Sequence, residues 1–242
     1  MSTDDNVITV NGLTVDVVRK DIKNLHLGVY PPDGRVRVAA PLNVSDEAVR
    51  LAVIGKLAWI RRQREKFTKQ PRQTDREAVT GESHYVFGRR YRLNVFEGEG
   101  PQQVVLRTKT KMELHVRPGA TTEQRLAVLD RWYRRQLRQT LEPMLNEWQT
   151  KIGVEPTFWG IKRMKTKWGS CNHNDARIWL NAELAKKPMP CIEYIVVHEL
   201  VHLLEPTHSE RFVELMGNAL PDWRTRRDQL NSSPLANETW TY

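Results

Sequence analysis

The sequence predicts an α+β fold, in which a small antiparallel β region with one helix precedes a module of several helices and a small sheet. Three observations support this class. Apolar and polar residues alternate between residues 7 and 42, apolar residues recur at helical spacing from residue 121, and the apolar stretch 192–204 contains the pattern His-Glu-x-x-His. We therefore divide the chain into a β-rich region, residues 1–120, and a second module, residues 121–242.

The first region begins with short strands separated by turns. Residues 7–18 predict one or two strands, and residues 25–30 and 36–40 predict two more, on either side of the turn Pro31-Pro-Asp-Gly34. Ser45 is expected to cap a helix that runs to about residue 67, because apolar residues follow it at helical spacing.

The remainder of this region predicts a linker and further strands. The polar stretch 68–80, which contains Pro71, suggests the linker. Residues 85–95 are expected to form a hairpin or a bulged pair around Gly88, and residues 103–108 and 111–116 add two strands. No internal repeat is apparent.

The second module opens with a capping box, Thr121-Thr-Glu-Gln124, and a long amphipathic helix that extends to about residue 151. Residues 158–163 and 176–181 are then expected to be strands, with a turn-like loop at 168–171 between them. The remaining elements are the apolar helix after Pro188 and Pro190, a capped helix from His208, and a final helix from Pro221 to about residue 230.

The chemistry of the chain is concentrated in His198-Glu199-Leu200-Val201-His202 and in His208. Two imidazoles four residues apart lie on one face of a helix, about 5–6 Å apart at Cβ, so both can bind one metal ion. Glu199 stands beside the first imidazole and can reach a water on the metal as a general base. This pattern is typical of zinc hydrolases.

The alternative is that both histidines are satisfied core residues and that Glu199 is incidental, since the pattern also arises by chance. His208 weakens this alternative. Pro206 is expected to end the helix after His202, and Thr207-His-Ser-Glu210 has the form of a capping box that opens the next helix. The turn between the helices would bring His208 to the metal, which gives three protein ligands and one open position, as in catalytic zinc sites.

Composition limits the location and the partners. Among the 242 residues, no run approaches the ~20 apolar residues of a membrane span, and the polar, acidic start is unlike a secretory signal. Two cysteines, Cys171 and Cys191, are too few for a disulfide framework. We expect a cytoplasmic protein that binds no membrane.

The net charge of +9 is spread over clusters of arginine and lysine. Such clusters are typical of solvated helix faces and strand edges, and contact with nucleic acid or a nucleotide is the alternative. The clusters are Arg61-Arg62, Arg89-Arg90 with Arg92, Arg134-Arg135 with Arg138, Lys162 to Lys167, and Arg224 with Arg226-Arg227.

Three segments of the second module resemble the YgjP-like and SprT-like zinc metallopeptidases, relatives of the wider His-Glu-x-x-His zincins. They are Lys165-Thr-Lys-Trp-Gly-Ser-Cys171 with Ile178-Trp-Leu-Asn181, the stretch from Tyr194 to His202 with His208-Ser209, and Pro221-Asp-Trp223. The likeness spans nearly the whole chain and is strongest from about residue 153 to 230. It implies that residues 121–242 form a zincin-like metallopeptidase module.

The resemblance also implies the parts of the site. His198, His202 and His208 would bind Zn²⁺, Glu199 would be the base, a strand at 177–181 would border the cleft, and the substrate would be a protein or peptide. The chain departs from the metzincins, which share this histidine spacing, because Glu205 stands where they have glycine. We interpret Glu205 as solvated, with a supporting contact to the metal site as the alternative.

The segment 167–171 is expected to complete the site. Its hydroxyl, ammonium and backbone N–H groups could stabilise an oxyanion. The alternative is structural, with a packed tryptophan, a glycine turn and a small buried cysteine, and Cys171 as a fourth ligand would close the site. The candidates for substrate contact are Lys167, Trp168, Ser170 and Asn181.

Two rival functions stay open. The first is a metal-dependent hydrolase of nucleotides or phosphate esters, for which the basic residues would suit a triphosphate. The second is a non-enzymatic nucleic-acid-binding module with a structural zinc ion, which steeply salt-dependent DNA binding would support. Glu199 argues against a purely structural site, because a structural metal has no use for a base.

Overall fold

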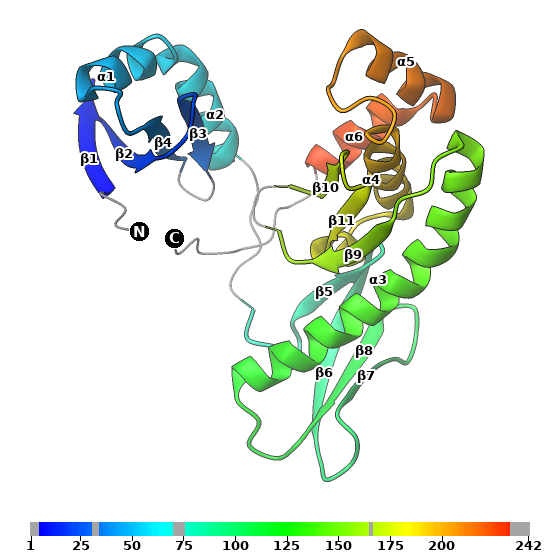
Figure 1. Cartoon of the computed structure of the whole chain (residues 1–242). Coiled ribbons are helices and arrows are strands. Elements are labelled where there is room, and N and C mark those ends of the chain that lie inside the picture. The colour runs from blue at the N-terminus through cyan, green and yellow to red at the C-terminus, as the bar shows by residue number, and fades with distance from the viewer. Residues whose placement is uncertain (1–4, 31–33, 70–75, 165–166, 233–242) are drawn as a thin grey trace. The chain divides into compact units, whose positions relative to one another are not determined.

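A computed structural model describes residues 5–30, 34–69, 76–164 and 167–232 (Figure 1). The chain forms two compact units that divide between residues 72 and 73. This division falls inside the polar stretch 68–80 that composition suggests as a linker. The boundary that we expected at residue 120 lies within the second unit, because the strands before it and the long helix after it belong to one hydrophobic core.

The first unit is a four-stranded sheet followed by two helices. The strand order is β1-β2-β4-β3, with β2 and β4 parallel and the outer pairs antiparallel, so the sheet is mixed and not purely antiparallel as expected. The α+β class itself is confirmed. The elements are β1 (Asp5–Val10), β2 (Leu13–Lys20), β3 (His26–Tyr30), β4 (Arg35–Pro41), α1 (Asp46–Ile54) and α2 (Leu57–Lys69).

The helix predicted for residues 45–67 is correctly capped but interrupted. The hydroxyl oxygen of Ser45 accepts a hydrogen bond from the Ala48 N–H at 3.2 Å, as an N-cap does. The first helix ends at Gly55, whose N–H donates to the carbonyl of Leu51. The break splits the apolar residues into two groups, and α1 buries Val49 and Val53 in the core of this unit.

The second unit contains another four-stranded mixed sheet, which one long helix covers. The strand order is β5-β6-β8-β7, with β6 and β8 parallel. The capping box at Thr121 and Gln124 is present, and the helix extends one residue further than predicted. The elements are β5 (Ser83–Val86), β6 (Arg89–Glu97), β7 (Gln103–Leu106), β8 (Lys111–Val116) and α3 (Thr122–Ile152).

The two four-stranded sheets share one topology, although no internal repeat is apparent in the sequence. Each has the same strand order and pairing, and each is followed by a helix with an N-cap residue, Ser45 or Thr121. Each first hairpin also turns through two residues with positive φ, Asn11-Gly12 and Phe87-Gly88. Of the residues in the two turns, only the glycine is common to both.

The third sheet has three strands, β9 (Phe158–Lys162), β10 (Gly169–Asn172) and β11 (Arg177–Asn181), in the order β10-β11-β9. The strands at 158–163 and 176–181 are confirmed. The turn-like loop predicted at 168–171 is wrong, because Gly169 to Asn172 pair antiparallel with β11. Pairing with a neighbouring strand overrides the weak strand preference of glycine and serine.

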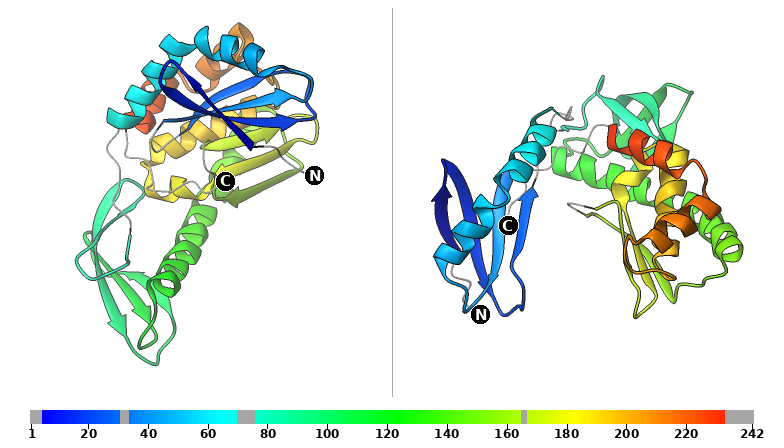
Figure 2. Two further views of the ribbon diagram at one scale, coloured as in Figure 1. Left: turned by 90° about the vertical axis from the view of Figure 1, so that its left-hand side faces the viewer. Right: turned by 90° about the horizontal axis from the view of Figure 1, so that it is seen from above.

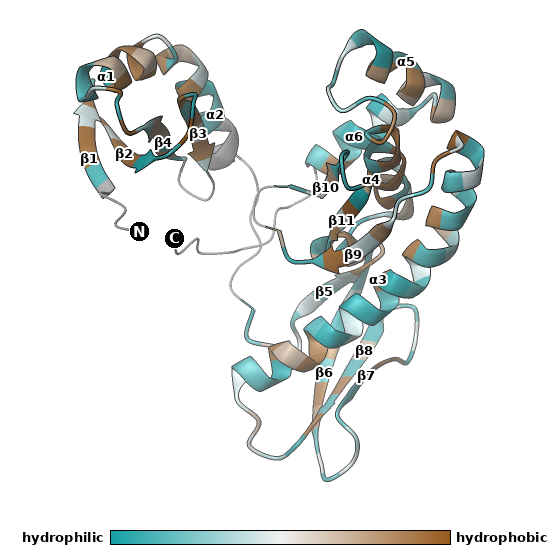
Figure 3. Cartoon of the chain, in the orientation of Figure 1, coloured by the Kyte–Doolittle hydropathy of each residue, from teal (hydrophilic) through white to brown (hydrophobic). Residues whose placement is uncertain are grey.

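The helices η1 (Ala182–Lys186), α4 (Met189–Val201), α5 (Glu210–Ala219) and α6 (Trp223–Ser232) complete this unit. Helix α4 is apolar around most of its circumference and packs against α3, α5 and α6 (Figures 2 and 3). Its predicted burial is confirmed. Within the described residues, no helix has both the length and the apolar character needed to span a bilayer.

The hairpin turn at Gly88 packs against the start of α4. The N–H of Phe87 donates to the carbonyl of Ala185 at 2.9 Å. A Cβ atom at Gly88 would lie 3.0 Å from Cα of Pro188, which is the N-cap residue of α4. Glycine is therefore required at residue 88 both by its positive φ and by this close approach.

Candidate metal centre and active-site pocket

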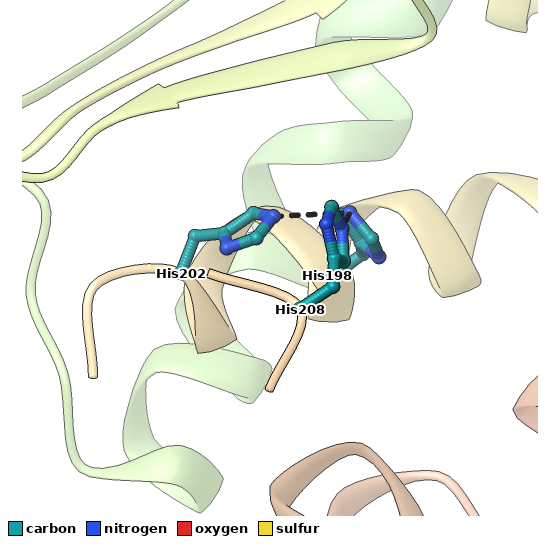
Figure 4. Close-up of side chains that lie close together, drawn as sticks. All are labelled: His198, His202 and His208. Atoms are coloured by element: carbon teal, nitrogen blue, oxygen red, sulfur yellow. Dashed lines mark hydrogen bonds between the residues drawn. The ribbon is translucent and has the colours of Figure 1, made fainter. Parts of the chain in front are cut away.

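Three histidines converge at the C-terminal end of α4 (Figure 4). His198 and His202 lie one turn apart on the helix, and His208 comes from the segment that joins α4 to α5. Nε2 of His198 lies 3.2 Å from Nε2 of His202 and 3.2 Å from Nε2 of His208. All three ligand atoms lie within 4.8 Å of one another.

This spacing fits one tetrahedral ion. Nitrogen ligands about 2.0–2.1 Å from a tetrahedral zinc ion are separated from each other by about 3.3 Å. Nδ1 of His202 lies 3.0 Å from the backbone carbonyl of Glu205. A hydrogen bond donated there leaves Nε2 unprotonated, and it is the usual way in which a metal-binding histidine is oriented.

Burial favours the neutral form of His198 and His202. Burial lowers the pKa of His198 to about 3, and the neighbouring His202 and His208 lower it further. Burial also lowers the pKa of His202. The ring of Phe212 packs 4.6–5.0 Å from the ring centroids of all three histidines. Neutral imidazoles that pack on an apolar ring such as Phe212 can bind a cation through their unprotonated nitrogens.

His208 reaches this position by a route that differs from the predicted one. Helix α5 begins at Glu210 and is capped by Ser209, whose oxygen accepts a hydrogen bond from the Phe212 N–H at 3.2 Å. Thr207, the predicted cap, instead donates to the carboxylate of Glu205 at 2.7 Å. His208 therefore lies in the connecting turn, before the helix. Glu205 stabilises this turn with its carboxylate and orients His202 with its carbonyl.

Glu199 is 4% exposed and lies against β10. An added Cβ at Gly169 would lie 2.6 Å from Cγ of Glu199, so the absence of a side chain at residue 169 makes room for the carboxyl group. Burial raises the pKa of Glu199 to about 8, and the ammonium group of Lys167 opposes the shift. The carboxyl group of Glu199 on α4 thus packs directly against Gly169 on β10.

A pocket of about 450 Å³ opens over the histidines. It brings Lys167, Trp168 and Ser170 of the sequence-predicted substrate residues together with Glu199. Cys171 also lines the pocket, but its sulfur is not among the converging ligand atoms, and burial followed by the charge of Glu199 raises its pKa to about 11. The lining residues are Lys167, Trp168, Gly169, Ser170, Cys171, His173, Ile195, His198, Glu199, His202, Pro206 and His208.

Asn181, the fourth predicted substrate residue, lies outside this pocket. Its side chain is buried and does not line this pocket. The amide nitrogen donates to the carbonyls of Met164 and Lys167 at 2.8 Å each, and the amide oxygen accepts from the N–H of Glu183 at 3.1 Å. The side chain therefore anchors both ends of the segment that leads into β10.

Sequence reasoning missed several residues around the pocket. His173 lines it, and its Nδ1 lies 3.2 Å from the carbonyl of His202. Tyr194 makes an edge contact with His198 and stacks on Trp223, so the Pro-Asp-Trp segment packs against α4. Lys187, buried, lies 5.0 Å from the Trp168 ring, and burial lowers its pKa to about 8. None of these follows a spacing rule, because each depends on a tertiary contact.

The edge strand at the pocket is β10. The strand at 177–181, which the resemblance placed beside the cleft, is β11, the central strand of its sheet. Among the described strands β10 pairs only with β11, and it contributes Gly169, Ser170 and Cys171 to the pocket. Its other edge is the one available to an extended peptide beside the histidines.

An α+β fold with a buried His-Glu-x-x-His helix, a third histidine and an edge strand at one pocket is typical of metallopeptidases. The chain matches the family model described as YgjP-like, metallopeptidase domain, over residues 23–233, and it belongs to the YgjP-like family. It is therefore a peptidase-type hydrolase, and its family implies a metal ion.

No curated protein matches the chain. The crystal structure of the metallopeptidase zymogen of Pyrococcus abyssi abylysin is 21% identical, and the match covers 37% of this chain and 90% of that chain with a TM-score of 0.35. The zymogen of Methanocaldococcus jannaschii jannalysin is 20% identical, with 37% and 94% covered and a TM-score of 0.32.

Proposed function

We propose that the chain is a zinc-dependent peptidase in which His198, His202 and His208 hold the ion and Glu199 is the general base. The observation that carries this proposal is the convergence of the three Nε2 atoms in a pocket that also contains the Glu199 carboxyl group. Three nitrogen ligands with room for a fourth ligand are typical of catalytic zinc. When bound, the ion supplies a Lewis acid that activates water and polarises a carbonyl group.

The residues of this chain have separate tasks in that reaction. Glu199 accepts the proton of the attacking water and returns it to the leaving amine, as a general base that becomes a general acid. The free edge of β10 pairs with the extended backbone of the substrate and aligns its carbonyl with the pocket. The ammonium group of Lys167 and the hydroxyl of Ser170 are the groups available to an oxyanion.

The decisive experiment compares wild type with Glu199→Gln, with metal content measured on both proteins. We expect about one zinc ion per chain in each, because the substitution leaves the three histidines intact. Casein should be cleaved by wild type alone. A metal-free protein, or cleavage that persists in Glu199→Gln, would contradict the proposed mechanism. His208→Ala provides the matched variant, which should lose zinc and activity together.

The same experiment decides between the rival functions. A panel of nucleoside triphosphates is offered to the same proteins, and release of phosphate that depends on Glu199 would indicate a phosphohydrolase. Metallopeptidase family membership favours the peptide substrate. DNA binding with a steep salt dependence, unchanged in Glu199→Gln and without hydrolysis of either substrate, would indicate the binding module.

A further inference from the structure

A second pocket, of about 360 Å³, lies on the outer face of the β5–β8 sheet. Its lining shares no residue with the pocket over the histidines, and the sheet and α5 lie at opposite ends of the second unit (Figures 1 and 2). The residues that line it are Gly81, Ser83, Arg90, Arg92, Thr110 and Lys111. Three are cationic, two carry hydroxyl groups, and none is acidic.

The strand register places the charged groups side by side. Arg92 on β6 is paired with Ser83 on one neighbouring strand and with Lys111 on the other. Arg90 lies two residues before Arg92 and therefore on the same face. The guanidinium of Arg92 extends toward Gly81, where an added Cβ would lie 3.5 Å from its Nη2 atom. A row of hydroxyl, guanidinium and ammonium groups thus crosses three strands.

These positive charges have no counter-charge of their own. Within the part of the chain that the structure describes, the side chains of Arg90, Arg92 and Lys111 form no ion pair or hydrogen bond. The nearest acidic residues are engaged elsewhere: Glu82 pairs with Arg76, and Glu113 pairs with Arg107 at 2.8 Å. Like charges gathered in one hollow repel one another, so an anion that enters it relieves the repulsion.

We infer that this pocket binds a compact phosphorylated anion, such as a polyphosphate chain or the phosphate tail of a nucleotide. Guanidinium groups bind phosphate oxygens in pairs, and the ammonium and hydroxyl groups supply further donors. The charge is local, because the next residues on this face of β6 and β8 are Asn94, Phe96 and Glu113. A nucleic-acid strand needs a longer basic track, so a compact ligand is favoured. This site is independent of the proposed zinc chemistry.

The test is calorimetric titration of the full chain with tripolyphosphate, ATP and inorganic phosphate. We expect saturable binding of one tripolyphosphate per chain, with ATP similar and inorganic phosphate weaker because it meets fewer of the donors. The variant Arg90→Gln/Arg92→Gln should raise the Kd of tripolyphosphate at least tenfold. Both residues are exposed, so the variant should melt within a few degrees of wild type.

The control is Arg131→Gln/Arg135→Gln, which removes the same charge from two exposed arginines on α3. It should change the Kd of tripolyphosphate less than twofold. Equal losses in both double variants, or no saturable binding by wild type, would overturn the inference. Tighter binding of an oligothymidylate than of tripolyphosphate, lost in Arg90→Gln/Arg92→Gln, would also overturn it in favour of a nucleic-acid surface.

Polyphosphates also chelate metal ions, so the titration is repeated on metal-stripped His208→Ala. Unchanged affinity there places the binding away from the histidines. A Kd that rises with the loss of the metal site would assign the binding to that site and contradict the second pocket. Because the readout is binding and not cleavage, failure of the zinc peptidase proposal leaves this test intact.

Discussion

Gly169 and Glu199 occupy complementary space, because the carboxyl group of the helix residue fills the volume that a side chain on the strand residue would take. Gly169 is at the start of the edge strand, and Glu199 lies in α4 directly after His198. The strand that is expected to hold the substrate and the base that is expected to activate water are thus fitted directly to each other.

Gly169→Ala should therefore displace the Glu199 carboxyl group and leave the histidines in place. We expect kcat for casein cleavage to fall roughly 10²-fold, since a displacement of about 1 Å at a catalytic group has this effect. Zinc content should stay at the wild-type level. Gly217→Ala, on α5 with open space around its Cβ position, is the control and should have near wild-type activity. Wild-type kcat in Gly169→Ala would contradict this role of the glycine.

Asn181→Ala should destabilise the fold as well as the site. It leaves the partly buried carbonyl groups of Met164 and Lys167 and the buried N–H of Glu183 without the partner that the amide provides. We expect a loss of about 1–3 kcal/mol in the free energy of unfolding, measured in urea. If Asn181 contacts the substrate instead, KM should rise while the free energy of unfolding is unchanged, which would contradict the anchoring role.

His84 should make the stability of the second unit depend on pH. Burial, followed by the charges of Arg76 and Lys186, lowers its pKa in the folded state to about 3 from the usual value of 6.5. The unfolded chain therefore takes up a proton at this residue between pH 6.5 and about 3 while the folded chain does not, and stability falls as the pH falls through this window.

The comparison that isolates this effect is His84→Gln, which carries no charge at any pH. In mid-window the free energy of unfolding of wild type should decline more steeply than that of the variant, by about one proton, or about 1.4 kcal/mol per pH unit. Above pH 7 the two curves should run parallel. Parallel curves down to pH 4 would show that the folded state accepts the proton as readily as the unfolded chain.

The two units should respond separately to damage in their cores, because the two hydrophobic cores share no residue. Ile60→Ala, in the first core, should cost about 2–5 kcal/mol and lower one calorimetric transition. Zinc content and casein cleavage should be unaffected below that transition. Leu137→Ala, in the second core, is the matched variant and should lower the other transition together with the activity. A single transition that shifts in both variants would contradict this independence.

The convergence of the histidines could be predicted from the sequence because their spacing reflects local geometry. Residues at i and i+4 share a helix face, which places His198 beside His202. A proline after the helix ends it, so that a turn can bring His208 back toward them. The path of His208 was not predictable. The hydroxyl of Thr207 donates a hydrogen bond to Glu205, and Ser209 caps α5 in its place.

The elements around the site were less predictable, because they form through pairing between distant strands. Gly169, Ser170 and Cys171 have turn-like or neutral preferences, and they become a strand because β11 offers partners for their backbone groups. The mixed character of the sheets has the same cause. Alternation of apolar residues identifies a strand but not the neighbour with which it pairs, so a parallel pair such as β2 and β4 looks like an antiparallel one.

The first hairpins of the two four-stranded sheets differ in the contacts that their turns make. The turn at Asn11-Gly12 has nothing within 4 Å of its glycine's Cβ position, whereas the turn at Phe87-Gly88 touches Pro188 and bonds to Ala185. The first turn thus has no such contact at its glycine, whereas the second turn packs against the start of the helix that carries His198. The same substitution in the two turns would therefore have unequal effects, with a local change at Gly12 and a displacement of α4 at Gly88.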